Sequence, residues 1–176
     1  MQIELIRPSM EYKRQIIEMM DEWSSTGEKI VPYSIRRIDY HNFDEYMYAF
    51  DQEVNGPIRE GFVRNTTYFV YQASSDKFVG AVNIRHTLNE ELLKAGGHIG
   101  DGVRPSERRK GYATEMIRLA LDKCRELNID CVMMSCDKDN IGSSKSIIKN
   151  GGKLEKEFVN EEGVMEQIYW IKLNSD

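Results

Sequence analysis

The stretch Gly102-Val103-Arg104-Pro105-Ser106-Glu107-Arg108-Arg109-Lys110-Gly111-Tyr112-Ala113 decides the fold, because it ends a strand-like segment and opens a strongly periodic helix. Apolar residues then recur at the i, i+3, i+4, i+7 spacing of one helix face, at Ala113, Met116, Ile117, Ala120, Leu121, Cys124 and Leu127. N–H groups in the first turn of a helix have no partner inside the helix and lie at the positive end of its dipole. We therefore predict a pyrophosphate-binding turn, with the helix beginning close to Gly111.

Four cations stand beside this turn, at Arg104, Arg108, Arg109 and Lys110. Both guanidinium and ammonium groups bind phosphate oxygens, so the cluster suits a ligand with more than one phosphate. A basic cluster before a helix is also typical of solvated surface, and the cluster alone does not separate the two interpretations.

Two widespread phosphate motifs do not fit. The P-loop needs Gly-Lys followed by Ser or Thr, whereas the order here is Lys110-Gly111-Tyr112. The dinucleotide fingerprint needs a third glycine, but Gly100-Asp101-Gly102 is followed three positions on by Pro105.

An acyltransferase pattern does fit this turn. Arg-x-x-Gly-x-Ala is present as Arg108-Arg109-Lys110-Gly111-Tyr112-Ala113, after a predicted strand and before an amphipathic helix. The next predicted strand, 131–136, is followed by Asn140, Ser143 and Gly151, which would begin, line and close a second helix. In order and spacing, these residues resemble the acetyl-CoA-binding motif of the GNAT superfamily of N-acyltransferases.

The resemblance extends over residues 68–173. Segments 85–89 and 96–100 look like a bacterial branch of this superfamily whose members are described only as predicted acetyltransferases. The resemblance implies an α/β (α+β) fold with a central mixed, mostly antiparallel sheet, flanked by helices and with splayed central strands. We expect a single domain over residues 1–176, because the chain has no internal repeat, low-complexity run or Pro-rich linker.

The resemblance also implies acetyl-CoA as cosubstrate and the place of each of its parts. The pantetheine arm would pair along Asp101-Gly102-Val103, and the pyrophosphate would lie on the backbone N–H groups of residues 109–113. Asn140 and Ser143 would line the thiol end, although Asn140 equally reads as a plain helix cap. The candidate acetyl-CoA contacts are therefore Gly102, Val103, Arg108, Arg109, Lys110, Gly111, Tyr112, Ala113, Asn140 and Ser143.

Composition limits the other classes of function. The apolar fraction of 40% and charged fraction of 30% are typical of a globular protein in water. A net charge of −5 argues against nonspecific nucleic-acid binding, which needs surplus cations on one face. No apolar run approaches the ~20 residues that span a bilayer, and we expect no secretory signal, because the first residues are not basic ones followed by an apolar run. Because Cys124, Cys131 and Cys136 lack C-x-x-C spacing, we expect reduced thiols, no metal site and a cytoplasmic location.

Periodicity and turn residues place the other elements. Further helices are expected after Ser9, after an Asn42–Glu45 capping box and after Asn140. Strands are expected at 3–7, 66–72, 78–86, 97–103, 131–136, 152–158 and 165–173.

The first two helices and their connection would form much of the acceptor wall, as the resemblance implies. The candidates to face the acceptor are Tyr33, Tyr40, Tyr46, Asp39, Asp44 and Glu45. For each residue taken singly, ordinary packing or a solvated carboxylate is the favoured interpretation.

Acyl transfer to an amine requires the neutral amine. A lysine-like amine with a pKa near 10.4 costs about 4.6 kcal/mol to deprotonate at pH 7, so a positioned base is useful. His98 and Asp101 on the predicted central strand are the candidate catalytic residues, and His86 is a third. On a regular strand His98 and Asp101 point to opposite faces, so they do not form a direct pair unless the strand bulges. A lone histidine on a strand also reads as a hydrogen-bonded structural residue.

One position departs from the superfamily pattern. Many members carry a tyrosine seven residues after the asparagine, where it protonates the leaving thiolate, but this chain has Ile147. Either the leaving group needs no acid, or another hydroxyl substitutes, or the chain has lost turnover.

Two main functions therefore stay open. The first is an acetyl-CoA-dependent N-acetyltransferase that serves a primary amine of a small molecule or peptide by direct attack in a ternary complex. Its expected assembly is a homodimer, with no nucleic-acid or membrane partner. The second is a noncatalytic acyl-CoA sensor or interaction module, and an ordinary α/β protein with a basic helix start is a further alternative.

Overall fold

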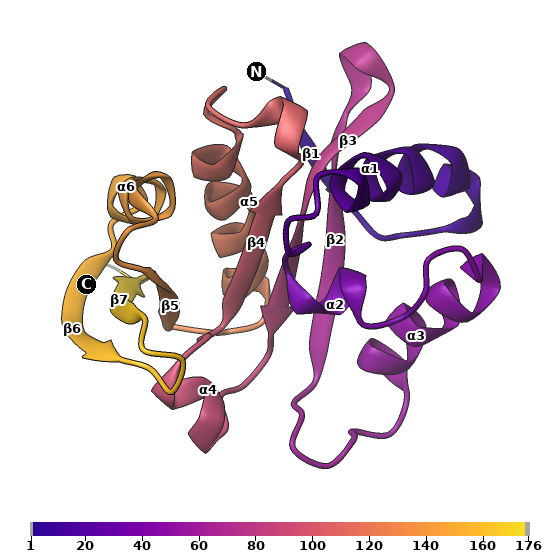
Figure 1. Ribbon diagram of the computed structural model, residues 1–176. Coiled ribbons are helices and arrows are strands. Elements are labelled where there is room, and N and C mark those ends of the chain that lie inside the picture. The colour runs from indigo at the N-terminus through magenta and orange to yellow at the C-terminus, as the bar shows by residue number, and fades with distance from the viewer. Residues whose placement is uncertain (1, 175–176) are drawn as a thin grey trace.

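The computed structural model describes residues 2–174 and contains two antiparallel sheets with helices packed around them (Figure 1). The first sheet has the strand order β1-β2-β3-β4 and the second has β5-β7-β6. The strands are β1 (Glu4–Ile6), β2 (Asn65–Gln72), β3 (Lys77–Arg85), β4 (Ile99–Val103), β5 (Cys131–Asp137), β6 (Lys153–Val159) and β7 (Met165–Lys172). The predicted α/β class, with antiparallel strands flanked by helices, is confirmed.

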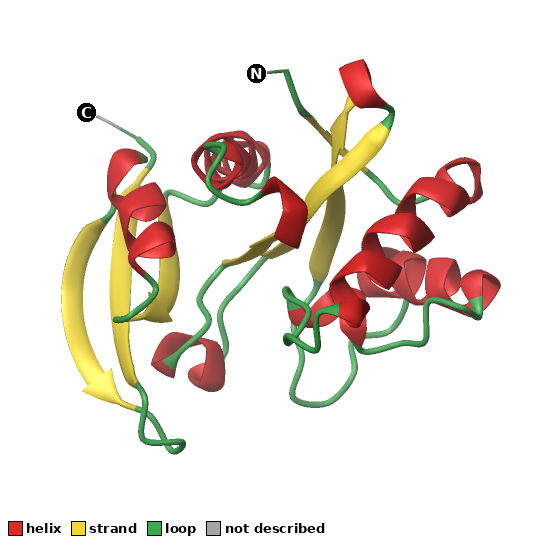
Figure 2. Cartoon of the chain, turned by 45° about the horizontal axis from the view of Figure 1, so that its top comes forward, coloured by secondary structure: helices red, strands yellow, loops and turns green. Residues whose placement is uncertain are grey.

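The helices lie on both faces of the first sheet and beside the second (Figure 2). They are α1 (Lys13–Ser25), α2 (Tyr33–Arg36), α3 (Phe43–Asn55), α4 (Glu90–Lys94), α5 (Tyr112–Glu126) and α6 (Ile141–Lys149). Short 3-10 turns are η1 (Met10–Tyr12), η2 (Ala73–Ser75) and η3 (Pro105–Glu107). Helices α1 and α3 pack against β3 and β2, whereas α5 packs against β4, β3 and α6.

Side chains of the first sheet alternate between two cores. Val82 and Ile84 on β3 and Ile99 on β4 belong to the core beneath α5. Phe69 and Ala81 belong to the core beneath α1 and α3. This period of two follows from the pleat of the strands, and it separates the two faces of the sheet.

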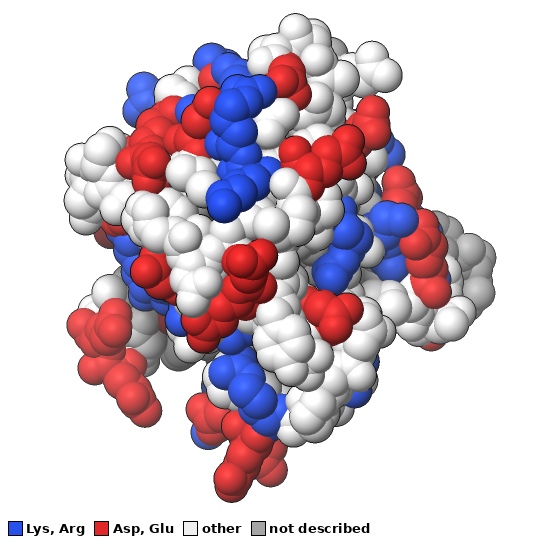
Figure 3. All heavy atoms as spheres, turned by 90° about the vertical axis from the view of Figure 1, so that its right-hand side faces the viewer, with Lys and Arg blue, Asp and Glu red and all other residues white. Residues whose placement is uncertain are grey.

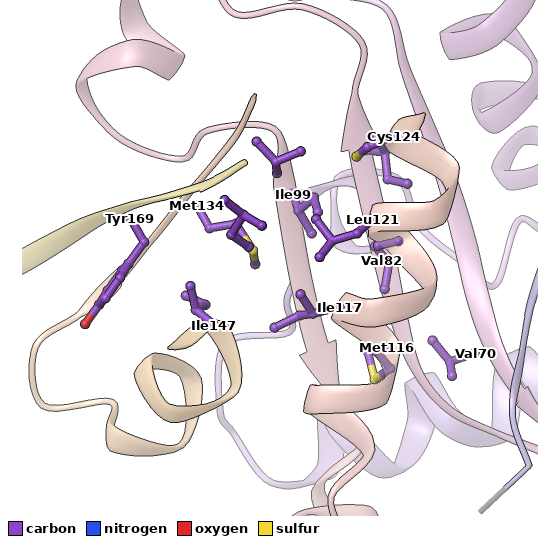
Figure 4. Close-up of a cluster of buried hydrophobic side chains, with 14 of the residues drawn as sticks. Val70, Val82, Ile99, Met116, Ile117, Leu121, Cys124, Met134, Ile147 and Tyr169 are labelled. Carbon is purple, nitrogen blue, oxygen red and sulfur yellow. The ribbon is translucent and has the colours of Figure 1, made fainter. Parts of the chain in front are cut away.

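Helix α5 joins the two sheets through one continuous core. Ile117 and Leu121 on α5 pack in the same cluster as Met134, Ile147 and Tyr169 of the second sheet and α6 (Figure 4). Because protein interiors are close-packed, this shared core fixes the second sheet relative to the first. The space between β4 and β5 therefore has a defined geometry.

Two predicted helix starts differ in detail. Asn42 precedes α3, but its side chain makes no cap hydrogen bond; its Nδ2 donates instead to Glu45 Oε2 at 2.7 Å. The predicted capping box is therefore absent, because the two side chains bond each other rather than the backbone. Ser9 precedes the 3-10 turn η1 without a side-chain cap, and α1 begins only at Lys13.

On the side of α1 and α3, acidic and basic side chains are interspersed (Figure 3). No broad field of one sign covers this view, so nothing here resembles the cationic surface that nucleic acids need. Within residues 2–174, no helix combines the length and apolarity required to cross a membrane. The same residues contain no group of three or more histidine, cysteine or acidic side chains placed to hold a metal ion.

Candidate active site

The turn before α5 leaves a row of backbone donors without acceptors. Gly111 is the N-cap of α5, has φ of 86° and makes no side-chain cap hydrogen bond. Within residues 2–174, no acceptor is present for the N–H groups of residues 109–114. Such donors at the positive end of a 15-residue helix bind an anion well. The turn fits the pyrophosphate of acetyl-CoA.

Tyr112 and Ala113 contribute to this turn through their backbone. The Tyr112 side chain is buried in the core, and its hydroxyl accepts a hydrogen bond from Gln72. Ala113 is half-buried in the first turn of α5. Both residues therefore offer N–H groups to a ligand, rather than side chains.

The cations beside the turn divide into two groups. Arg104 is a structural residue, because it pairs with Glu22 of α1 and donates to the carbonyl of Phe78 at 3.2 Å. Arg108 pairs with Glu28 at 2.7 Å, but its side chain is 42% exposed, so the pair contributes little stability and can open for a phosphate. Arg109 is exposed and has no ion pair within residues 2–174.

Lys110 is held by a carboxylate that the sequence did not single out. Glu107 is buried, and it bonds both Lys77 and Lys110, the latter at 3.0 Å. Burial alone would raise the pKa of Glu107, but these two ammonium groups hold it below its usual value. The Lys110 side chain is 52% exposed, so this pair, like that of Arg108, contributes little stability and can open for a phosphate.

The two sheets touch where β4 begins. His98 donates its N–H to the carbonyl of Met133 at 2.8 Å, and its Nδ1 accepts the Met133 N–H at 3.0 Å. A single bridge between Gly97 and Met134 adjoins this contact. Beyond it, no backbone hydrogen bond joins β4 to β5 in residues 2–174, so the strands splay as predicted.

This separation leaves β4 with one open edge. Arg85 on β3 donates its N–H to the carbonyl of His98 at 2.7 Å, which sets the phase of the β3–β4 ladder. Because backbone groups alternate between the two edges of an antiparallel strand, those of Asp101 and Val103 point toward the gap, where the Val103 carbonyl accepts a hydrogen bond from the exposed Arg108 Nε at 3.3 Å. An extended amide chain such as the pantetheine arm fits this edge as an added strand does.

Gly102 lies against the α1–α2 connection, whereas the family resemblance placed it beside the pantetheine arm. Its backbone groups are directed toward β3, and a Cβ at this position would clash with the Val31 carbonyl and lie 2.8 Å from the Trp23 ring. The close approach of the α1–α2 connection explains this glycine. The predicted direct contact of Gly102 with a pantetheine arm is therefore not what its position favours, since its backbone groups pair with β3.

Asp101 carries a carboxylate next to the open edge. It pairs with Val82 across the ladder, and the two side chains therefore share the face that packs on α5. Within residues 2–174 its carboxylate has no hydrogen-bond partner. Burial raises its pKa to about 6. Asp101 is thus a weakly held carboxylate whose pKa suits proton transfer near neutral pH.

His98 has its Nδ1 already engaged. Burial, together with the charge of Arg85, lowers the pKa of His98 to about 4, so the ring is neutral at pH 7. Since Nδ1 accepts the Met133 N–H, the ring proton is on Nε2. In this form the ring can donate a hydrogen bond but has no free nitrogen lone pair. His86, the third histidine considered, has Nε2 2.8 Å from Thr66 Oγ1, and burial lowers its pKa.

The start of α6 lies on the other side of the gap. Asn140 is the N-cap of α6, and its Oδ1 accepts the N–H of Ser143 at 3.1 Å, as its reading as a cap predicted. The Ser143 side chain lies beside Cys136 at the end of β5, where burial raises the thiol pKa to about 11. Ile147 is fully buried in the core beside Gly152, where a Cβ would clash with it.

The predicted acceptor residues take different places. Tyr46 is fully buried and donates to the carbonyl of Ile35 at 2.7 Å, so it cannot face an acceptor. Tyr40 bonds Asp21 at 2.7 Å, and burial raises its pKa to about 12. Asp39 bonds His41 at 2.9 Å on the surface. The exposed carboxylate candidates Asp44 and Glu45 lie in the first turn of α3.

Tyr33, the remaining acceptor candidate, lines a cavity of about 280 Å³. The cavity lies between α2, the segment 61–65, β3 and the start of α4. Most of its polar lining was not predicted from the sequence, namely Ser34, Glu53, Asn65, Asn83, Arg85, Asn89 and Glu91. A second cavity, of about 230 Å³, lies on the outer side of α3 and includes Glu45 and Arg59.

Comparison with protein families agrees with this geometry. The model of the acetyltransferase (GNAT) domain family matches residues 17–153, most of the 176-residue chain. The chain therefore belongs to the GNAT acetyltransferase family. It is an acetyl-CoA-dependent N-acyltransferase. No curated protein matches the chain.

Solved structures share the fold over nearly the whole chain. A ribosomal L7/L12 alpha-N-protein acetyltransferase, RimL, in complex with coenzyme A has a TM-score of 0.70 at 13% identity, covering 99% of this chain and 96% of its own. The microcin C7 self-immunity acetyltransferase MccE, in complex with acetyl-CoA and AMP, has 0.68 at 16%, covering 97% and 92%. The dodecameric spermidine N-acetyltransferase of Vibrio cholerae has 0.66 at 16%, covering 98% and 94%. At such identities the likeness is one of fold.

Proposed function

We propose that this enzyme transfers the acetyl group of acetyl-CoA to a primary amine of a small molecule or peptide, by direct attack in a ternary complex. One arrangement carries the proposal. The unpartnered N–H groups of residues 109–114 and the open β4 edge at Asp101 and Val103 form a continuous track for the pyrophosphate and pantetheine parts. A thioester at the end of this track lies beside the carboxylate of Asp101.

The reaction follows from this placement. The neutral amine nitrogen attacks the thioester carbonyl carbon, a C–N bond forms, and the carbonyl oxygen carries the negative charge. When the C=O bond re-forms, the C–S bond breaks and coenzyme A leaves as thiolate. The nitrogen loses one proton along the way, because the product is a neutral amide.

Asp101 is the proposed acceptor of that proton. Its pKa of about 6 leaves it mostly ionised at pH 7, and its carboxylate has no competing partner within residues 2–174. The nitrogen becomes more acidic once the C–N bond forms, so a base of this strength can take the proton directly or through water. His98 is proposed to keep β4 and β5 at the correct separation rather than to accept the proton.

The leaving group needs less help. A thiol with a pKa near 8.5 is expelled as thiolate at pH 7 at a cost of only about 2 kcal/mol relative to the protonated thiol. The aliphatic side chain of Ile147, at the position where many relatives carry a tyrosine, is compatible with such a reaction. The thiolate then takes a proton from water.

Release of free coenzyme A thiol tests the proposal. We expect release from acetyl-CoA only when a suitable primary amine is added, with one acetylamide formed per thiol. Acetyl-CoA alone should raise the melting temperature, because it binds only the folded protein. Stabilisation without thiol release across a broad amine panel would instead support the noncatalytic acyl-CoA module.

A further inference from the structure

Arg85 is a half-buried cation without an acidic partner. It ends β3 and lines the 280 Å³ cavity. Its Nη1 donates to the carbonyls of Gly96 and Gly97 at 3.2 and 3.0 Å. Within residues 2–174 it forms no ion pair. Burial lowers the pKa of Arg85, and no nearby carboxylate opposes that effect.

The acidic groups of the cavity are already neutralised. Glu53 pairs through Oε1 with Arg37 at 2.7 Å, with both side chains more than nine-tenths buried, while its buried Oε2 has no hydrogen-bond partner within residues 2–174. Glu91 is exposed and pairs with Lys94 at 2.8 Å. Among the described residues that line the cavity, Arg85 is therefore the charged residue without an oppositely charged partner. A charge that is removed from water is stabilised by such a partner.

The rest of the polar lining is neutral and partly preorganised. Asn83 donates through Nδ2 to Asn65 Oδ1 at 2.7 Å and to Thr67 at 3.0 Å. Asn89 caps α4 through Oδ1 and donates to the carbonyl of Gly61 at 3.1 Å. Tyr33 stands at the exposed side of the cavity. This lining holds the guanidinium in a polar, restricted space.

The cavity also adjoins the strand that borders the reaction gap. A Cβ on Gly100 of β4 would lie 3.3 Å from Arg85 Nη2. Gly100 precedes Asp101, the proposed base, but successive strand residues point to opposite faces, so a ligand on Arg85 approaches the thioester along the open edge of β4, from the face opposite the Asp101 carboxylate. Val103, farther along the open edge, is about 10 Å from Gly100 at the usual rise of 3.3 Å per residue. A ligand group on Arg85 is thus within the length of a small molecule of the reacting amine.

We propose that Arg85 binds a carboxylate of the acceptor, so that the enzyme acetylates amines that also carry a carboxylate. This inference rests on the proposed function and specifies its substrate class. A carboxylate matches the guanidinium in charge and in its two-pronged geometry, and a single negative charge balances the cavity. An acceptor that is only cationic would meet an unopposed positive charge.

A matched series of acceptors tests the proposal. The ω-amino acids from glycine to 6-aminohexanoate are compared with their carboxamides for acetylation by the parent enzyme. We expect kcat/KM to favour the acid over the amide by about tenfold or more at the best chain length. Equal rates within every acid–amide pair would overturn the proposal, and so would a preference for O-phosphoethanolamine over every ω-amino acid.

Two variants separate recognition from folding. Arg85→Gln removes the charge but also the bonds to Gly96 and Gly97, so it can disturb the start of β4. Tyr33→Glu leaves those bonds in place and adds a competing carboxylate at the cavity. Both should bring the acid–amide ratio close to one, while Tyr33→Gln, of the same size without charge, should keep the preference of the parent.

A binding measurement separates this inference from the proposed function. Glutarate has no amine and cannot be acetylated. We nevertheless expect calorimetry to detect binding of glutarate to the parent enzyme, and to detect no binding of glutaramide. Binding should be lost in Tyr33→Glu and kept in Tyr33→Gln. Glutarate binding without acetylation of any amine would refute the proposed function alone. Amine acetylation with equal affinity for glutarate and glutaramide would refute the carboxylate site alone.

Discussion

The imidazole Nδ1 of His98 accepts the backbone N–H of Met133 at 3.0 Å, and this contact joins the two sheets at the point where they begin to diverge. A side chain thus takes the place of a backbone carbonyl in continuing the pairing of β4 and β5. Together with the His98 N–H bond to the Met133 carbonyl and the Gly97–Met134 bridge, this ring holds the two sheets together where the gap begins.

The first prediction concerns this ring. His98→Ala leaves the buried Met133 N–H without an acceptor and should lower the free energy of unfolding by about 1–3 kcal/mol. His98→Asn, whose Oδ1 can replace Nδ1, should recover most of that stability and most of kcat. The pH dependence of its activity should match that of the parent. Denaturant unfolding and steady-state kinetics measure both effects. A loss of activity of about 100-fold in a stable His98→Asn enzyme would mean that the ring itself transfers the proton.

The second prediction concerns Gly111. Its φ of 86° is a left-handed conformation that costs other residues about 1–2 kcal/mol. A side chain at this position would also crowd the backbone N–H groups that are proposed to bind the pyrophosphate. Gly111→Ala should therefore weaken acetyl-CoA binding strongly, as measured by calorimetry. Gly151→Ala is the matched control, because Gly151 has φ of 89° with open space around its Cβ position and lies at the far end of α6. Equal affinity in both folded variants would remove the pyrophosphate site from this turn.

The third prediction links activity and stability at Asp101. The folded pKa of about 6 lies above the reference value of 3.8, so the folded state favours the protonated carboxyl. The stability that this provides is complete below pH 3.8 and is lost as pH rises through 6, a difference of about 3 kcal/mol at most. Asp101→Asn should thus be more stable than the parent at pH 7, and about equally stable near pH 4.

The same substitution should act on catalysis in the opposite direction. Asp101→Asn removes the proposed base, so kcat should fall about 100-fold or more while the affinity for acetyl-CoA changes little. Thermal unfolding and amide formation, measured on one preparation, test the two halves together. A stabilised enzyme with unchanged kcat would exclude Asp101 as the base.

The fourth prediction concerns Ile147 and the missing acid. Ile147 is fully buried, so Ile147→Tyr should lower stability by about 1–3 kcal/mol through overpacking and should not raise kcat. Ile148→Tyr is the control, since Ile148 is 54% exposed and should tolerate the ring. In the parent, activity should rise with pH and then level off without a falling limb between roughly pH 8 and 10. A falling limb in the folded enzyme would show that another residue serves as acid.

The elements around the proposed acetyl-CoA site could be predicted from the sequence because their signals are local. The helix after Gly111 has an uninterrupted apolar stripe, and the β2–β3 pair has alternating β-branched and aromatic residues around a short turn. Asn140 was equally readable as a cap, and it is one. In each case neighbours in sequence determine the conformation.

The proposed acceptor site could not be predicted in the same way, because its geometry depends on distant segments. Nothing around Arg85 in the sequence indicates that the two carboxylates lining its cavity, Glu53 and Glu91, are paired with Arg37 and Lys94. The family resemblance made Tyr46 a candidate to face the acceptor, yet packing places its ring in the core. The family resemblance made Gly102 a candidate ligand contact, whereas the need for a glycine there comes from the Val31 carbonyl and the Trp23 ring.

The first sheet keeps its two cores on opposite faces, and this has a practical meaning for engineering. The proposed cosubstrate site, at the turn 109–114 and helix α5, shares little more than the strands with α2 and the segment 57–65, whereas α1 is tied to the region before the turn by the Arg104–Glu22 pair. A redesign could graft a new α2 and a new 57–65 loop onto this frame, and so retarget the enzyme to other amines while its cosubstrate chemistry is inherited unchanged.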